Sequence, residues 1–325
     1  MVNRTIIRLK VVQLLYEHYQ SGRQSVQQTL KDLLKSLDLA HELYMHMLLL
    51  IVAVTRAAQD EADKREELAR VAHSQAPIDR RLADNQFAAQ LSENKQLVAF
   101  REKHADSWAL DRAYLRLLLA DIEQSPAYRA YRQQPQTDYE GDRELWRRLY
   151  KQVIMPDQRI DDILEDTALF WNDDRPIIDT FVLKTIKQFD PRNGARQPLQ
   201  PQYRTAEADE EAQPAPGGDT EPEDERFAIE LLKQSIAREN ELRGIIKESV
   251  RGWDFERLAL MDIVTMQAAL AEILVFPLIP VSVTINEYVE IAKCYSTPRS
   301  PGYINGILDA VARRFFEKGI INKDF

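Results

Sequence analysis

Few side chains in this 325-residue sequence are spaced for catalysis or for metal binding. His41 and His46 resemble a zinc-binding helix, but residues five apart lie about 140° apart around a helix, whereas a shared metal needs histidines four apart. Asp162 and Asp166 are four apart and could do acid–base work, although an exposed acidic helix face is commoner. Cys294 is the only cysteine, which excludes a disulfide framework and a cysteine-rich zinc site. We predict no catalytic residues, no metal and no cofactor.

Cationic side chains near the N-terminus are better placed for binding chemistry. Arg4 and Arg8 are four apart, so they share one face of a helix. Lys10 adds charge on a different side. The formal net charge is −9, but nine acidic and no basic residues lie between Glu207 and Glu225. The rest of the chain is therefore near neutral, and its total charge does not exclude nucleic-acid binding.

The elements that must position these residues are helices. Apolar residues recur at helical spacing along most of the chain and strand-like alternation is scarce, so the predicted fold class is all-α. Predicted helices cover residues 24–37, 39–71, 78–103, 107–133 and 255–276. The longest apolar stretch, 43–55, spans about 20 Å as a helix, too short for a bilayer core of roughly 30 Å. With charges interrupting the first ten residues, no signal peptide is expected either, and we predict a cytoplasmic protein without membrane contact.

The composition divides the chain into four regions. Residues 1–58 hold the N-terminal helices, and 59–190 form a helical extension. Residues 191–226 are acidic and proline-rich, which predicts a disordered linker or a surface loop. Residues 227–325 form a C-terminal helical domain. Segment 145–190 could be a degenerate repeat of that domain, because both place two helices before a tryptophan and an acidic N-cap, Asp173 or Asp254; chance similarity of amphipathic helices is the alternative.

The C-terminal third carries motifs that resemble one family. RLALMD at 257–262, VTINEYVEIAK at 283–293 and SPGYINGILD at 300–309 follow one another in the order found in the NusB family, and RLKVVQLLY at 8–16 resembles its opening helix. The resemblance covers about the last 100 residues well and the first 20 moderately. The region from about 60 to 226 has no counterpart in short members of the family and is expected to be an extension.

The resemblance implies two packed helical bundles and an RNA-binding transcription antitermination factor that is not an enzyme. Its expected partners are boxA-type single-stranded RNA of ribosomal RNA leaders, the ribosomal protein NusE and the RNA polymerase antitermination complex. Two alternatives stay open. One is a helical protein-interaction scaffold that has lost RNA binding. The other, the RNA-binding subunit of a ribosomal RNA methyltransferase, is disfavoured because no glycine-rich cofactor loop or Rossmann region follows the NusB-like part.

The resemblance also implies which residues bind RNA, namely Arg4, Arg8, Lys10, Arg299, Ser300 and Tyr303. An aromatic side chain at position 303 can stack on an unpaired base. Tyr16 and Asn305 have either a structural or an RNA-binding role. We expect Asn305 to be a buried amide and Gly306 to permit close approach of a neighbouring helix. The whole assignment requires side chains from the two chain ends to converge in one groove.

Overall fold

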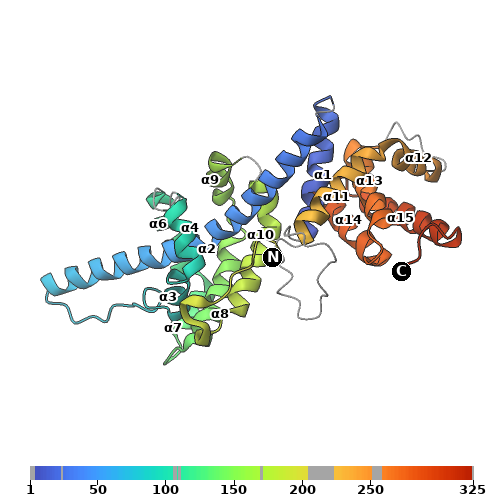
Figure 1. Cartoon of the computed structure of the whole chain (residues 1–325). Coiled ribbons are helices and arrows are strands. Elements are labelled where there is room, and N and C mark those ends of the chain that lie inside the picture. The colour runs from blue at the N-terminus through green and yellow to red at the C-terminus, as the bar shows by residue number, and fades with distance from the viewer. Residues whose placement is uncertain are drawn as a thin grey trace. The chain divides into compact units, whose positions relative to one another are not determined.

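A computed structural model describes residues 4–22, 25–104, 108, 111–168, 171–203, 223–250 and 258–323. The chain divides into two units (Figure 1). Unit 1 combines residues 1–38 with 201–325, and unit 2 comprises residues 39–200. The boundary falls inside one long helix, at residue 38 instead of the predicted 58. All regular elements in the described ranges are helical, which confirms the predicted fold class.

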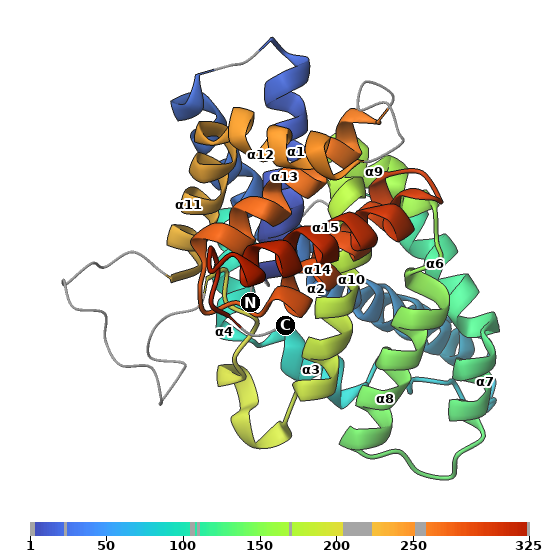
Figure 2. The same cartoon turned by 90° about the vertical axis from the view of Figure 1, so that its right-hand side faces the viewer.

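Unit 1 is built around one buried helix, α13. Its helices are α1 (Arg4–Gln20), the beginning of α2 (Val26–Val71), α11 (Glu223–Ala237), α12 (Glu239–Ser249), α13 (Leu260–Val275), α14 (Val281–Tyr295) and α15 (Ser300–Glu317). Nearly every residue of α13 from Asp262 to Ile273 is buried, because α1, α11, α12, α14 and α15 all pack on it (Figure 2). A helix that is apolar all round is expected at such a central position.

Unit 2 holds the remainder of α2 and the extension. Its other elements are α3 (Gln86–Ser92), α4 (Lys95–Lys103), α6 (Arg112–Gln124), α7 (Pro126–Arg132), α8 (Tyr139–Leu149), a π-helical turn η1 (Tyr150–Ile154), α9 (Arg159–Thr167), α10 (Trp171–Gln188) and a 3₁₀ helix η2 (Pro191–Arg196). Asn85, Asn94 and Ser125 cap α3, α4 and α7 by accepting hydrogen bonds from backbone amides at the start of each helix. These caps split segments that apolar periodicity alone predicts as continuous helices at 78–103 and 107–133.

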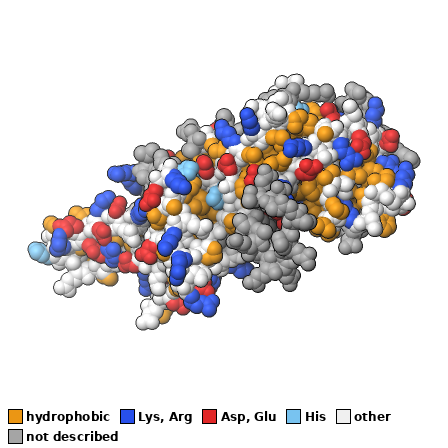
Figure 3. Space-filling model, in the orientation of Figure 1, with side chains coloured by type: hydrophobic (Ala, Val, Ile, Leu, Met, Phe, Trp, Pro, Cys, Tyr) orange, Lys and Arg blue, Asp and Glu red, His pale blue; other side chains and the backbone are white. Residues whose placement is uncertain are grey.

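The helix α2 is continuous where the sequence predicts two helices. It is long and apolar enough to cross a membrane, but 72% of its apolar window is buried inside the fold, which identifies it as a core helix. Its last turns leave the body of unit 2: Leu68 and Val71 are exposed, and acidic and basic side chains intersperse there (Figure 3). Charges of alternating sign along a solvated helix stabilise it through ion pairs, so the last turns of α2 stay helical with few apolar contacts.

Two further predictions change at the helix ends. The helix predicted to start at Phe255 begins at Leu260, with Ala259 as N-cap; Asp254 lies outside the described residues. Asp173 lies in the first turn of α10 and is not an N-cap. Part of the predicted linker is ordered, since η2 is followed by the buried residues Gln197 and Leu199. Residues 204–222 of that segment lie outside the described residues.

A buried carboxyl in unit 2 makes its stability depend on pH. Asp179 on α10 is 3% exposed, and its Oδ1 accepts a 2.6 Å hydrogen bond from the Tyr150 hydroxyl in the π-helical turn. Arg175 Nε lies 3.7 Å from its Oδ2. Burial outweighs both contacts and raises the pKa of Asp179 to about 6. The folded protein therefore retains a proton that the unfolded chain releases above about pH 3.9, so this group lowers stability as the pH rises from about 4 to 6.

Replacing Asp179 with asparagine should remove this pH dependence. Relative to wild type, Asp179→Asn should gain up to about 3 kcal/mol of unfolding free energy between pH 4 and about pH 7, because a pKa difference of one unit corresponds to about 1.4 kcal/mol. Urea unfolding can be followed by tryptophan fluorescence, since Trp108, Trp146 and Trp171 all lie in unit 2. Parallel pH profiles for the two proteins would contradict the assignment.

Candidate nucleic-acid interface

Arg8 is buried in a network of acidic and hydroxyl groups in unit 1. Its Nε and Nη2 each donate a 2.8 Å hydrogen bond to Glu272 of α13, and Nη1 lies 3.3 Å from Glu287 of α14. Arg8 is 3% exposed and Glu272 is fully buried. Burial lowers the pKa of Arg8, but the hydrogen bonds and charge of Glu272 outweigh it and the pKa is raised overall. Arg8 is thus held as a cation facing the protein interior.

Hydroxyl groups complete the coordination of the buried carboxylate. Thr284 donates to Glu272 at 2.7 Å and Tyr288 at 3.3 Å. Burial, reinforced by the charge of Glu272, raises the pKa of Tyr288 well above its usual range, so the phenol stays protonated as a donor. Four donor atoms therefore surround one carboxylate, the condition under which a buried charge is tolerated. The network joins α1, α13 and α14.

The other predicted cations of α1 differ in exposure. Lys10 is fully buried, and Arg4 is 27% exposed. Arg4 Nη2 donates to Glu223 Oε1 at 2.5 Å, and its guanidinium carbon lies 4.9 Å from the centre of the Phe227 ring. Of the three predicted N-terminal contacts, only Arg4 presents charge to solvent.

A cavity of about 470 Å³ opens beside Arg4, and we call it the Arg4 pocket. It is lined by Arg4, Glu223, Arg226, Phe227, Ile229, Glu230, Lys233 and Phe276. The rings of Phe227 and Phe276 meet edge to face with centroids 4.7 Å apart. Three cations, two carboxylates and two aromatic rings therefore surround one opening in unit 1, and the cations and rings are the groups that can bind an anionic strand with unpaired bases.

The loop before α15 and the first turn of that helix are organised by the buried carboxylate of Asp262, and we call Ser296 to Tyr303 the Asp262 loop. Asp262 is 2% exposed and accepts hydrogen bonds from Ser296 at 2.5 Å, from Ser300 at 3.1 Å and from the Tyr303 hydroxyl. Ser300 is fully buried, so it shapes the loop from inside. Tyr303 is half-buried with its hydroxyl anchored, and Arg299 is exposed at the N-cap of α15.

The two clusters lie at opposite ends of α13. Arg8 contacts Glu272 and the Arg4 pocket includes Phe276, whereas the Asp262 loop contacts the first turn of the helix. Ten residues separate Asp262 from Glu272, which corresponds to about 15 Å along a helix. The predicted convergence into one groove therefore fails for Arg8, which faces inward, and Arg4 and Arg299 belong to clusters at opposite ends of α13.

Two further structural predictions are wrong. Asn305 is exposed and not a buried amide, because it lies on the solvent side of α15. A Cβ added at Gly306 would meet nothing within 4 Å, so no neighbouring helix explains that glycine. Tyr16 is half-buried, and its hydroxyl accepts a 3.1 Å hydrogen bond from Gln20.

Sequence reasoning missed the acidic side of both clusters. Glu272 and Asp262 stand in an apolar helix, where charged residues are costly unless they are paired. Their presence in the sequence at 260–275 was a usable signal that donors from other helices must reach them. The pairing of Glu272 with Arg8 was not readable, since Arg8 lies more than two hundred positions away.

The Glu272 network predicts a non-additive effect on stability. Glu272→Met leaves the Arg8 cation buried without its counter-ion and should cost about 3–5 kcal/mol; Arg8→Met should cost a similar amount. The double variant should be more stable than either single variant, because it buries no charge. Urea unfolding followed by circular dichroism measures this, with Glu287→Gln at the half-exposed edge as a mild control. Additive losses in the double variant would show that the pair is not coupled.

Comparisons with known proteins match the C-terminal part of the chain, which contains Glu272, Asp262 and the Asp262 loop but not α1. The NusB family model matches residues 180–313. NusB antitermination proteins are similar in sequence: that of Salinibacter ruber is 34% identical over 105 residues, 32% of this chain and 66% of the relative. That of Koribacter versatilis is 41% identical over 29% of this chain and 65% of the relative. The protein of Geobacter sulfurreducens is 37% identical over 29% of this chain and 67% of its own length.

A solved structure of T. maritima NusB is 30% identical over 29% of this chain and 66% of that chain, with a TM-score of 0.28. The chain spans slightly less than two thirds of the length of the Salinibacter and Koribacter relatives. The match includes the motifs at 257–262, 283–293 and 300–309. The end of the first motif begins α13, the second lies in α14, which supplies Thr284 and Tyr288, and the third begins α15. On this similarity, the chain belongs to the NusB family, as a long form with an additional helical unit.

Proposed function

We propose that this protein is a transcription antitermination factor that acts by binding, without catalysis, in the cytoplasm. It binds boxA-type single-stranded RNA together with NusE and joins the antitermination complex on RNA polymerase. The observation that carries the proposal is the pair of solvent-facing cations, Arg4 and Arg299, set beside aromatic side chains in the unit that holds the family's motifs.

In this proposal only some of the predicted residues contact RNA directly. Arg4 and Arg299 bind phosphates, and Tyr303 offers its half-buried ring to an unpaired base. Ser300 acts from inside by holding the loop on Asp262. Arg8 and Lys10 face the interior and support α1. Tyr16 and Asn305 are accessible enough to line the strand's path.

Arg4 has two acidic partners. Glu223 is 56% exposed, and exposed pairs contribute at most about 1 kcal/mol because water and salt screen them. Asp224 is 1% exposed and its Oδ1 lies 3.5 Å from Arg4 Nε, so a phosphate would replace Glu223 while the contact with Asp224 remains. Bases entering the Arg4 pocket would meet Phe276, and stacking on an aromatic ring is worth about 1–3 kcal/mol per base.

One observation favours the scaffold alternative. Two of the three N-terminal cations are buried, and the apolar side chain of Leu278 is 95% exposed in the turn between α13 and α14, where a protein partner could cover it. In that case unit 1 binds proteins and has no measurable affinity for boxA RNA. The same titration distinguishes the two functions.

The test is a titration of fluorescent boxA RNA, with and without NusE, at about 50 mM and about 200 mM salt. Wild type should bind saturably, more tightly with NusE and more weakly at high salt. Arg4→Ala combined with Arg299→Ala should weaken binding about ten- to a hundredfold and lower the salt slope by about 1.4, since each single-strand phosphate contact contributes about 0.7.

Arg313→Ala is the matched control, because Arg313 is an exposed arginine of α15 in a similar surface ion pair with Asp309. It should bind RNA like wild type. Absence of binding at low salt with NusE present would favour the scaffold, and equal affinities for the double variant and the control would remove Arg4 and Arg299 from the interface.

A further inference from the structure

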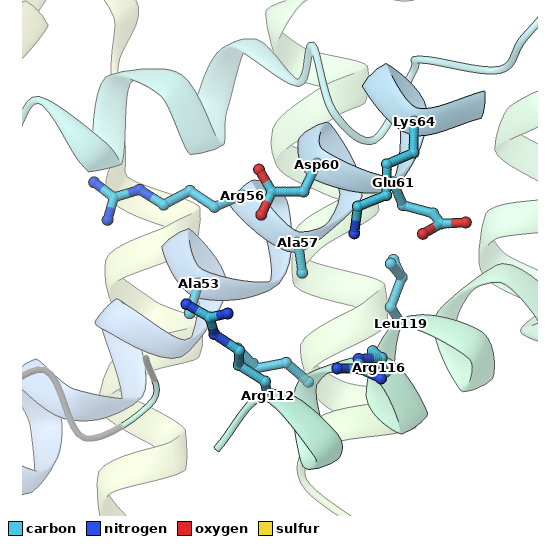
Figure 4. A pocket seen from close by; sticks show the side chains of 10 residues that line it. Ala53, Arg56, Ala57, Asp60, Glu61, Lys64, Arg112, Arg116 and Leu119 are labelled. Carbon is cyan, nitrogen blue, oxygen red and sulfur yellow. The ribbon is translucent and has the colours of Figure 1, made fainter. Parts of the chain in front are cut away.

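The extension contains a cationic groove of its own, between α2 and α6 in unit 2 (Figure 4). The cavity is about 320 Å³ and is lined by Ala53, Arg56, Ala57, Asp60, Glu61, Lys64, Arg112, Leu115, Arg116 and Leu119. We propose that this groove binds the sugar–phosphate backbone of single-stranded RNA without reading its sequence.

The charge around the groove is unbalanced toward cations. Four cationic side chains line it against two carboxylates, and one of these, Glu61, lies 3.3 Å from Arg65 outside the groove. Within the described residues no ion pair occupies Arg112 or Arg116. Figure 4 shows Lys64 reaching from α2 toward the space above α6, whereas the guanidinium of Arg112 ends beside Ala53. Surplus positive charge lining a cleft attracts an anionic ligand.

The position of the arginines on α6 points the same way. Arg112 is the first residue of the helix and Arg116 lies one turn later, while no acidic residue occupies the first turn. The N-cap residue Asp111 makes no side-chain capping hydrogen bond. Cations at a helix N-terminus are disfavoured by the helix dipole, which an anion at the same place would offset. Two arginines one turn apart can each contact a neighbouring phosphate of one strand.

The floor of the groove favours a backbone over an acidic peptide. Ala53 and Ala57 of α2 lie opposite Leu115 and Leu119 of α6. These short or apolar side chains leave room for ribose rings to approach the helices closely, with phosphates directed to the cations at the rim. An acidic peptide carries its charges on side chains instead, and its backbone amides and carbonyls would find few polar partners on this floor.

The experiment uses the full chain and two fluorescent single-stranded RNAs of equal length, one with and one without a boxA element. Arg112→Gln with Arg116→Gln should weaken binding of both RNAs about tenfold and lower the salt slope by about 1.4, for two lost phosphate contacts. Arg56→Gln with Lys64→Gln on α2 should do the same, and circular dichroism checks that each variant is folded.

The control is Lys184→Gln with Lys187→Gln, which removes two exposed lysines from α10 of the same unit and should leave both affinities unchanged. Equal affinities and salt slopes for groove and control variants would overturn the proposal, as would displacement of the RNA by polyglutamate at equal charge concentration. This proposal can fail independently of boxA recognition. Groove variants should keep the preference for boxA RNA over the other RNA, whereas the Arg4 and Arg299 substitutions test boxA recognition itself.

Discussion

A charge inside an apolar helix is the constraint on which unit 1 depends. Glu272 lies on α13, which is covered by helices on all sides, so its carboxylate must find its donors within the protein. Arg8 supplies a bidentate pair from α1, and Thr284 and Tyr288 add hydroxyl donors from α14. The same requirement appears at the other end of α13, where Asp262 gathers the serines of its loop. The helices that pack on α13 are therefore selected by the hydrogen-bond donors that its two carboxylates need, as well as by burial of apolar side chains.

This constraint explains what the sequence could and could not predict. Helical periodicity is a local signal, so the all-α class and most helix positions were readable. The ordered motifs at 283–293 and 300–309 identified the family. Arg8 was predicted to contact RNA but is buried. The sequence of a basic segment does not distinguish a solvated arginine from a buried one, and its partner Glu272 is remote in sequence. The breaks at the asparagine and serine N-caps were missed for a simpler reason. A single capping residue can start a new helix although the apolar periodicity continues through it.

Glycine and asparagine in α15 show a second limit. A glycine inside a helix costs about 1 kcal/mol relative to alanine, and the natural expectation is that packing compensates for it. Gly306 instead faces open space beside the exposed Asn305, and nothing within the described residues explains it.

Unit 2 is well ordered although the family's motifs do not reach most of it. It has its own capped helices and a buried core that includes Trp146, Tyr150 and Phe189.

The order of the chain has a consequence for its synthesis. Unit 2 is continuous in sequence, whereas α1 belongs with helices from the other end of the chain. At about 5–20 residues per second, α13 leaves the ribosome on the order of ten seconds to a minute after α1. During that interval the apolar face of α1, including Ile7 and Leu15, and the cation of Arg8 have no native partner. Unit 2 can fold during this interval, whereas unit 1 can fold only after α13 and the helices around it have been synthesised. Chaperones therefore have time to act on α1 before unit 1 folds.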